Sequence, residues 1–130
     1  MNNPKKKIVI IDDEESFLMI FGKALEKEGF EVKGFNNPKE ALMKIVEEKP
    51  DLIILDIKMP EMDGFEVFKH LKTDLQGNFP KIVFLTNIGE TPSGQGIDEN
   101  FIQSIGGQGY IRKSDDLDKI ISKIKQTLMS

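Results

Sequence analysis

Short apolar runs alternate along this chain with longer stretches in which apolar residues recur every three or four positions. A run of four apolar residues is typical of a strand buried on both faces, and the longer spacing is typical of an amphipathic helix. Buried strands are therefore predicted at residues 8–11, 52–55 and 82–85. Residues 31–35 alternate between polar and apolar, which predicts a half-exposed edge strand, and residues 109–113 predict a final strand.

Two helices are expected in the first half of the chain. The first is predicted over residues 15–28, with Gly29 as its stop. Its positions at helical spacing are Phe17, Phe21, Ala24, Leu25 and Glu28. Asn37 is suited to cap a second helix whose first turn holds Pro38, and Pro50 is expected to end it. The inward face predicted for this second helix consists of Ala41, Leu42, Ile45 and Val46.

Three further helices are expected in the second half. The third is predicted to start near Asp63, and its apolar face carries Phe65, Phe68 and Leu71. A short fourth helix is expected at residues 98–105, between the glycine-rich segments 89–96 and 106–109. Ser114 is expected to cap the last helix. The inward face predicted for that helix consists of Leu117, Ile120, Ile121, Ile124 and Leu128.

Strands that alternate with helices indicate an α/β fold with helices on both faces of a parallel sheet. The weak, alternating strand belongs at an edge, and right-handed crossovers then give the strand order 2-1-3-4-5. We therefore expect a flavodoxin-like, doubly wound, five-stranded parallel sheet with five helices. A length of 130 residues fits one domain over residues 1–130, with a basic, flexible lead at residues 1–6 and no output domain.

Polar side chains come directly after the predicted strands, at the edge where ligands bind in such sheets. Asp12 and Asp13 follow the first strand, Asp56 the third, Thr86 the fourth and Lys113 the fifth. Each has an ordinary alternative, because the aspartates could cap a helix or shape a turn, Thr86 could simply end a strand and Lys113 could be solvated. Three clustered carboxylates repel one another, however, and a cation would offset that cost. An all-oxygen set of ligands predicts Mg²⁺ or Mn²⁺.

Composition narrows the classes of function. The net charge is −4 and Arg112 is the only arginine, which argues against a direct nucleic-acid ligand. The apolar runs are too short to insert into a membrane. Cysteine is absent, which excludes thiolate metal sites and fits a reducing, cytoplasmic location. The acidic loop after the first strand would repel a phosphate-bearing cofactor, so a flavin-binding flavodoxin is disfavoured, and a colourless purified protein would dismiss it.

Three stretches of the sequence resemble the receiver domains of two-component response regulators. They are Ile-Val-Ile-Ile-Asp-Asp-Glu at residues 8–14, Asp-Leu-Ile-Ile-Leu-Asp-Ile-Lys-Met-Pro-Glu-Met-Asp-Gly at residues 51–64, and Tyr-Ile-Arg-Lys at residues 110–113. A strand that ends in Thr86 lies between the last two. The resemblance covers essentially the whole chain, and the middle stretch is highly specific when it follows a buried strand.

The resemblance implies a role for each of these positions. Asp56 would accept a phosphoryl group from a sensor histidine kinase or a phosphotransfer protein. Thr86 and Lys113 would contact the attached group. Tyr110 would follow the movement of Thr86 and alter the surface of the fourth helix, fifth strand and fifth helix, where a downstream protein partner would dock. Mg²⁺ would be held by Asp12, Asp13, Asp56 and the backbone carbonyl of Lys58.

The sequence departs from the family pattern in two places. Proline usually follows the conserved lysine, in a cis peptide, whereas here Ser114 follows Lys113, which leaves open whether this peptide is trans. The chain between Thr86 and Lys113 is also longer than usual, with the excess in the glycine-rich segment. These departures keep one alternative open, a pseudo-receiver that binds partners independently of phosphorylation. His70, the only histidine, is interpreted as a solvated helix residue.

Overall fold

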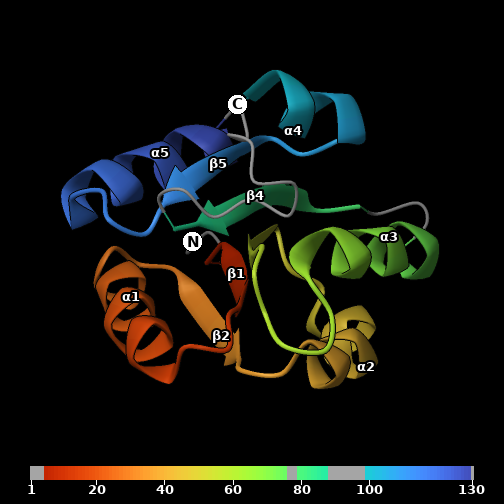
Figure 1. Ribbon diagram of the computed structural model, residues 1–130. Helices are drawn as coiled ribbons and strands as arrows, with labels where there is room; N and C mark the ends of the chain where they lie inside the picture. Colours follow the sequence, from red (N-terminus) through yellow and green to blue (C-terminus); the bar gives the residue numbers. More distant parts are fainter. Residues whose placement is uncertain (1–4, 76–78, 88–98, 130) are drawn as a thin grey trace.

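Five parallel strands form one sheet in the order β2-β1-β3-β4-β5, as predicted. The computed structural model describes residues 5–75, 79–87 and 99–129, and Figure 1 shows the arrangement of their elements. The strands are β1 (Lys7–Ile11), β2 (Glu31–Phe35), β3 (Leu52–Asp56), β4 (Lys81–Thr86) and β5 (Gly109–Arg112). The helices are α1 (Glu15–Lys27), α2 (Pro38–Glu48), α3 (Gly64–Asp74), α4 (Glu99–Ile105) and α5 (Leu117–Met129).

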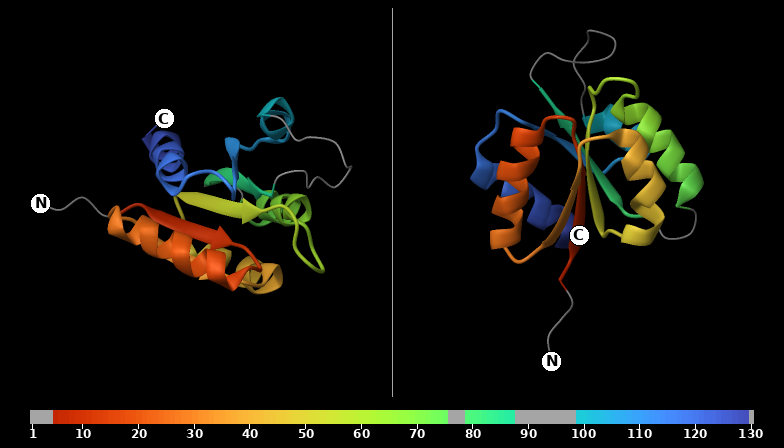
Figure 2. Two further views of the ribbon diagram at one scale, coloured as in Figure 1. Left: turned by 60° about the vertical axis from the view of Figure 1, so that its left-hand side comes forward. Right: turned by 90° about the horizontal axis from the view of Figure 1, so that it is seen from below.

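Helices cover both faces of the sheet (Figure 2). Because successive strand residues point to opposite faces, each buried strand contributes to two apolar clusters. On one face, Val9 and Ile53 pack with Ile45 of α2, Val67 of α3 and Ile102 of α4. On the other face, neighbouring strand residues pack against α1 and α5, through side chains that include Phe21, Leu25, Ile120 and Ile124. This two-sided burial explains why the central strands are apolar without interruption.

Side chains cap the second and third helices, the second at Asn37 as predicted. The side chain of Asn37 accepts hydrogen bonds from the backbone N–H groups of Lys39 and Glu40, at 2.9 and 3.2 Å. Asp63 forms a capping box with Glu66, in which each side chain accepts from the other's backbone N–H. Both contacts satisfy backbone donors that the first helical turn leaves without partners.

Three predictions about helix residues are wrong: the inward positions of Val46 and Leu117, and the cap at Ser114. Val46 was expected to face inward, but 55% of its surface is exposed, because it lies one position round from buried Ile45 and beyond the stripe that contacts the sheet. Ser114 does not cap the last helix. It lies in a turn closed by the Asp115 N–H on the Arg112 carbonyl, and α5 begins only at Leu117, a residue that is itself 39% exposed.

The fourth helix is short and lies within the range predicted for it. The glycine-rich segment at residues 89–96 lies outside the described residues. Of the described helices, none combines the length and the apolar character needed to cross a bilayer.

Candidate functional site

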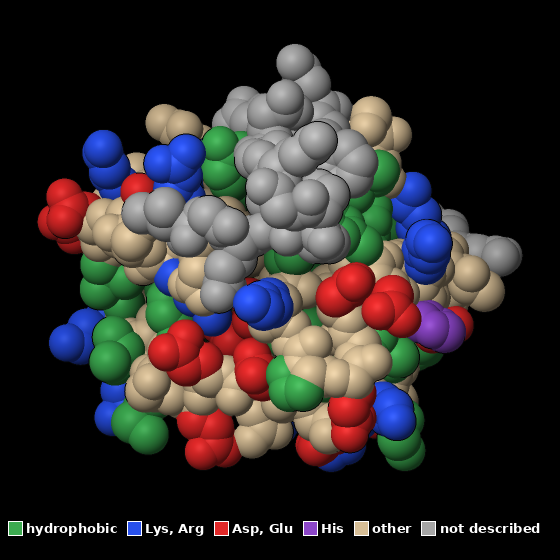
Figure 3. Space-filling model, viewed as in Figure 1, with side chains coloured by type: hydrophobic (Ala, Val, Ile, Leu, Met, Phe, Trp, Pro, Cys, Tyr) green, Lys and Arg blue, Asp and Glu red, His purple; other side chains and the backbone are tan. Residues whose placement is uncertain are grey.

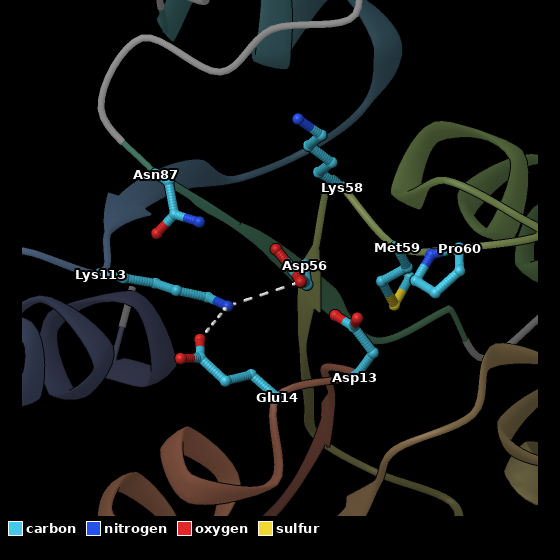
Figure 4. A pocket seen from close by; sticks show the side chains of 8 residues that line it. All are labelled: Asp13, Glu14, Asp56, Lys58, Met59, Pro60, Asn87 and Lys113. Carbon is cyan, nitrogen blue, oxygen red and sulfur yellow. Dashed lines mark hydrogen bonds and ion pairs between the residues drawn. The ribbon is translucent and has the colours of Figure 1, made fainter.

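A pocket of about 570 Å³ opens at the carboxyl ends of the strands. Its lining residues are Asp13, Glu14, Asp56, Lys58, Met59, Pro60, Asn87 and Lys113. Figure 4 shows the carboxylates of Asp13 and Asp56 close together and that of Glu14 turned toward the Lys113 ammonium, whereas the side chain of Lys58 points away from them. Thr86 and Tyr110 are absent from the residues that line this pocket.

Three aspartates converge beside the pocket, as the sequence predicted, although Asp12 is itself absent from the lining. Carboxylate oxygens of Asp12, Asp13 and Asp56 lie within 4.8 Å of one another. Asp12 is fully buried and Asp56 is 3% exposed, whereas Asp13 is exposed. Figure 3 shows acidic side chains gathered near the centre of the molecular face seen in Figure 1. The buried pair is held by the ends of two strands that are themselves enclosed in the core, so these two carboxylates cannot move apart easily.

The oxygen atoms of Asp12 have different surroundings. Oδ1 accepts a hydrogen bond of 3.0 Å from the backbone N–H of Glu14. Oδ2 lies 2.7 Å from the ammonium of Lys113 as an ion pair, but no donor in the described part of the chain meets it with hydrogen-bond geometry. A buried carboxylate oxygen with an unused lone pair, next to two further carboxylates, fits a divalent cation with oxygen ligands.

The same crowding changes the acidity of Asp56. Burial and the neighbouring Asp12 carboxylate raise the pKa of Asp56 from an ordinary value of 3.8 to about 8, although the ammonium of Lys113 acts in the opposite direction. Asp13 adds a smaller repulsion of the same sign as that of Asp12. A cation bound among these carboxylates would favour their charged forms and lower that pKa.

Lys113 reaches the acidic cluster from the turn after β5. Its ammonium lies 2.7 Å from Asp12, 3.2 Å from Glu14 and 3.5 Å from Asp56, and its side chain is 8% exposed. Burial acts to lower the pKa of Lys113, but its contacts with Asp12, Asp56 and Glu14 together outweigh this and raise the pKa above 10.5. No peptide bond among the described residues is cis, so Lys113 reaches the site with a trans peptide before Ser114.

The turn after Asp56 depends on Gly64. A Cβ atom at this position would lie 2.4 Å from the backbone oxygen of Asp56 and 2.9 Å from the Cα of Ile57. The Gly64 N–H also donates to the Ile57 carbonyl at 2.7 Å. Only a glycine lets the start of α3 approach the backbone of the acidic residue this closely, which gives the Met-Asp-Gly end of the motif a physical reason.

Thr86 and Tyr110 occupy less direct positions. Thr86 is 8% exposed at the end of β4, and its hydroxyl donates to the Asn87 carbonyl at 3.0 Å. Tyr110 is half-buried in β5, where Lys123 lies over its ring at 5.3 Å and donates to its carbonyl at 2.8 Å. Their roles in a switch stay predictions.

Four pocket residues were not predicted as site residues: Glu14, Met59, Pro60 and Asn87. Each directly follows a predicted site residue or another lining residue, which is the only signal that could have found them. His70 is exposed on α3, in line with its interpretation as a solvated residue.

Fold and site together define a doubly wound α/β domain with an acidic pocket at the carboxyl ends of its strands, suited to a divalent cation. A family model described as the response regulator receiver domain matches residues 8–125. This chain therefore belongs to the receiver domains of two-component response regulators.

Individual relatives agree over nearly the full chain. It is 31% identical to sporulation initiation phosphotransferase F of Bacillus subtilis, with 95% of this chain and 94% of that protein covered. It is 33% identical to the polar-differentiation response regulator DivK of Brucella anthropi, with 95% and 96% covered. A CheY-like receiver domain protein from Methanospirillum hungatei superposes with a TM-score of 0.80 at 30% identity, over 97% of this chain and 95% of that one.

Other relatives match only in part. Identity to the alkaline phosphatase synthesis transcriptional regulatory protein PhoP of B. subtilis is 46% over 67 residues, and the match covers 28% of that protein. The chain spans 49% of the probable transcriptional regulator ycf27 of Pyropia yezoensis. The absence of an output domain and of a direct nucleic-acid ligand, and the cytoplasmic location, stay predictions.

Proposed function

We propose that the protein is a signalling switch that accepts a phosphoryl group on Asp56 from a phosphohistidine of a sensor kinase or phosphotransfer protein. The observation that carries this is the position of Asp56, which is almost fully buried at a pocket beside two further aspartates and one ammonium. A carboxylate held there has access to a donor through the pocket and a lysine ready to meet the charge that arrives.

The transfer conserves electrons in a simple way. One carboxylate oxygen of Asp56 attacks phosphorus, the phosphorus–nitrogen bond breaks, and the bonding electrons remain on the imidazole nitrogen. The product is an acyl phosphate at Asp56. Lys113 then pairs with a phosphoryl oxygen, and the Thr86 hydroxyl turns from the Asn87 carbonyl to donate to another.

A divalent cation fits this site because three carboxylates crowd together there and the single ammonium of Lys113 offsets only part of their charge. Mg²⁺ or Mn²⁺ would neutralise repulsion between Asp56 and the oxygens of the incoming group. The ligands proposed for it are Asp12, Asp13, Asp56 and the backbone carbonyl of Lys58. Lys58 lines the pocket while its side chain points away from the carboxylates, which is compatible with a role for its backbone (Figure 4).

Output is proposed to pass through Tyr110 to the surface of α4, β5 and α5. The similarity to a phosphotransferase and to response regulators supports two uses, relay of the phosphoryl group or docking on a downstream protein. The competing hypothesis is a pseudo-receiver that uses the same surface without phosphorylation.

Mass spectrometry after incubation with acetyl phosphate and Mg²⁺ separates these hypotheses. The wild-type protein should gain one phosphoryl group and Asp56→Asn should gain none. Asp51→Asn is the matched control, because Asp51 directly precedes β3 at its opposite end, where it is exposed and accepts from the Lys7 N–H. Wild-type protein that stays unmodified would favour the pseudo-receiver, and equal labelling of Asp56→Asn would place the acceptor elsewhere.

The cation is tested separately by thermal unfolding. Mg²⁺ in ten- to thirtyfold excess over its dissociation constant should stabilise the protein by about 1.4–2 kcal/mol. Asp13→Asn should lose most of this gain and Asp51→Asn should keep it, because only the first belongs to the acidic cluster. Melting temperatures that do not respond to millimolar Mg²⁺ would contradict the metal site.

A further inference from the structure

Of the three described carboxylates that pair with the Lys113 ammonium, only that of Glu14 has no role in the proposed reaction. Asp12 and Asp56 belong to the proposed metal and acceptor site, but Glu14 is absent from the acidic group whose oxygens lie within 4.8 Å of one another. Its Oε1 nevertheless lies 3.2 Å from the Lys113 ammonium, and its side chain is 56% exposed at the rim of the pocket (Figure 4).

The first turn of α1 directs this side chain toward Lys113. Glu14 occupies the N-cap position with extended backbone, yet its side chain makes no capping hydrogen bond. Its backbone serves the site and the helix instead, because its N–H donates to Asp12 and its carbonyl accepts from Leu18 at 3.1 Å. The side chain is therefore available to cross to the ammonium, 99 residues away in sequence.

An aromatic ring completes the contact. Phe17 lies three residues after Glu14, a spacing that places both on one side of a helical turn. The centroid of its ring is 5.0 Å from the Lys113 ammonium, a cation–π distance. The ammonium is thus held from the α1 side by a carboxylate and a ring, and from the sheet side by Asp12 and Asp56.

A phosphoryl group on Asp56 gives the Lys113 ammonium new acceptors. It replaces the single charge of the Asp56 carboxylate with up to two negative charges on strong acceptor oxygens next to Lys113. A lysine ammonium has three donors, and Lys113 already contacts Asp12, Glu14 and Asp56, so additional phosphoryl oxygens compete with Glu14 for them. The exposed Glu14 carboxylate also repels the incoming group.

We propose that Glu14 is a positioning residue that holds Lys113 in the unphosphorylated protein and releases it to the phosphoryl group, so that Glu14 opposes entry into the phosphorylated state. This inference rests on the proposed function of Asp56. The contact between Glu14 and Lys113 would make the affinity of the unphosphorylated protein for a phosphoryl group lower than the aspartates and Lys113 alone would give.

Titration calorimetry with beryllofluoride in excess Mg²⁺ tests the proposal, because this anion mimics a phosphoryl group on a carboxylate. Glu14→Gln should bind it about fivefold more tightly than wild type, as expected for loss of one partly exposed ion pair. Glu15→Gln is the matched control. It removes the same charge one residue away, but the Glu15 carboxylate accepts from Asn36 at 2.6 Å. It should leave the affinity unchanged.

A second measurement reports on the lysine itself. The NMR signal of the Lys113 ammonium, assigned with Lys113→Arg, should shift between wild type and Glu14→Gln in the resting proteins. The two signals should coincide once beryllofluoride is bound, because Lys113 has then left Glu14. A purely structural effect of residue 14 would shift the signal in both states.

The outcomes separate this proposal from the proposed function. If wild type does not bind beryllofluoride, or Asp56→Asn binds it equally, the assignment of Asp56 fails and the role of Glu14 fails with it. If wild type binds through Asp56 but Glu14→Gln binds no more tightly, the role of Glu14 alone is wrong. Equal tightening in Glu15→Gln would reduce the effect to net charge and would also overturn it.

Discussion

At each end of the sheet one lysine lies among carboxylates, but the pKa shifts differ: the charged form of the lysine is favoured at one end, and the charged form of a buried carboxylate is disfavoured at the other. At the amino end, Lys7 lies 2.6 Å from Glu48 and 3.5 Å from Glu31, and the backbone N–H of Lys7 donates to Asp51. At the carboxyl end, Lys113 meets Asp12, Glu14 and Asp56.

Exposure separates the two groups. The Lys7 and Glu48 side chains are 20% and 19% exposed, so water shares their charges. The Asp12 and Asp56 side chains are 0% and 4% exposed. Burial of like charges raises the pKa of Asp56 to about 8, whereas at the amino end contact with Glu48 raises the pKa of Lys7 and favours its charged form. A similar set of residue types therefore favours the charged lysine at one end and disfavours the charged form of a buried carboxylate at the other.

The largest expected effect on stability comes from a steric overlap with the backbone at the carboxyl end of the sheet. In Gly64→Ala the new Cβ would overlap the Asp56 carbonyl at 2.4 Å, so we expect a loss of about 3 kcal/mol, at the upper end for overpacking. Phosphorylation by acetyl phosphate should slow as well, because Asp56 must shift.

Gly22→Ala is the control for the loss of a glycine. A Cβ at this position in α1 would meet Val32 at an ordinary 3.6 Å, so the helix should gain up to about 1 kcal/mol. Urea unfolding measures both variants, and a Gly64→Ala protein as stable as wild type would show that the turn after Asp56 can relax.

The second effect is the pH dependence of the metal-free protein. The folded pKa of Asp56 is about 8 and its ordinary value is 3.8, so the folded protein binds the proton more tightly than the unfolded chain. The contribution of Asp56 to stability is therefore fully present below pH 3.8 and is lost as the pH rises toward and through 8. The slope cannot exceed about 1.4 kcal/mol per pH unit, which corresponds to one proton.

The difference between wild type and Asp56→Asn isolates this slope from other groups. Urea unfolding in chelator at pH 5 to 8.5 should show the free energy of unfolding of wild type falling relative to Asp56→Asn. Saturating Mg²⁺ should remove most of the trend, because the cation favours the charged carboxylate. Asp51→Asn should keep the wild-type slope, and a difference that rises with pH would contradict the crowding of Asp56.

The sequence predicted the features that depend on hydrophobic periodicity and on which residues follow the strands. Strand order, the convergence of Asp12, Asp13 and Asp56, and the cap at Asn37 each follow from local pattern plus the rule for parallel sheets. The contact between Glu14 and Lys113 could not be predicted, because it depends on how far two side chains reach across the pocket. The prediction that Val46 faces inward was wrong because hydrophobic periodicity locates the centre of a buried helix face more reliably than its edge.

The smallest effect belongs to the amino end. Lys7→Met removes the contacts with Glu48 and Glu31, which are partly exposed and shared with water, so we expect a cost below about 1 kcal/mol. Because its pKa is raised above 10.5, the contribution of Lys7 is present below that value and is lost only as the pH rises through the raised pKa. Between pH 5 and 8.5 the difference in the free energy of unfolding between wild type and Lys7→Met should therefore carry no slope from Lys7, in contrast to the Asp56→Asn comparison.

Acetyl phosphate should label Lys7→Met at the wild-type rate, since no residue of this network lines the pocket. A loss of labelling with unchanged stability would mean that the two ends of the sheet are coupled, and the contrast between them would then fail.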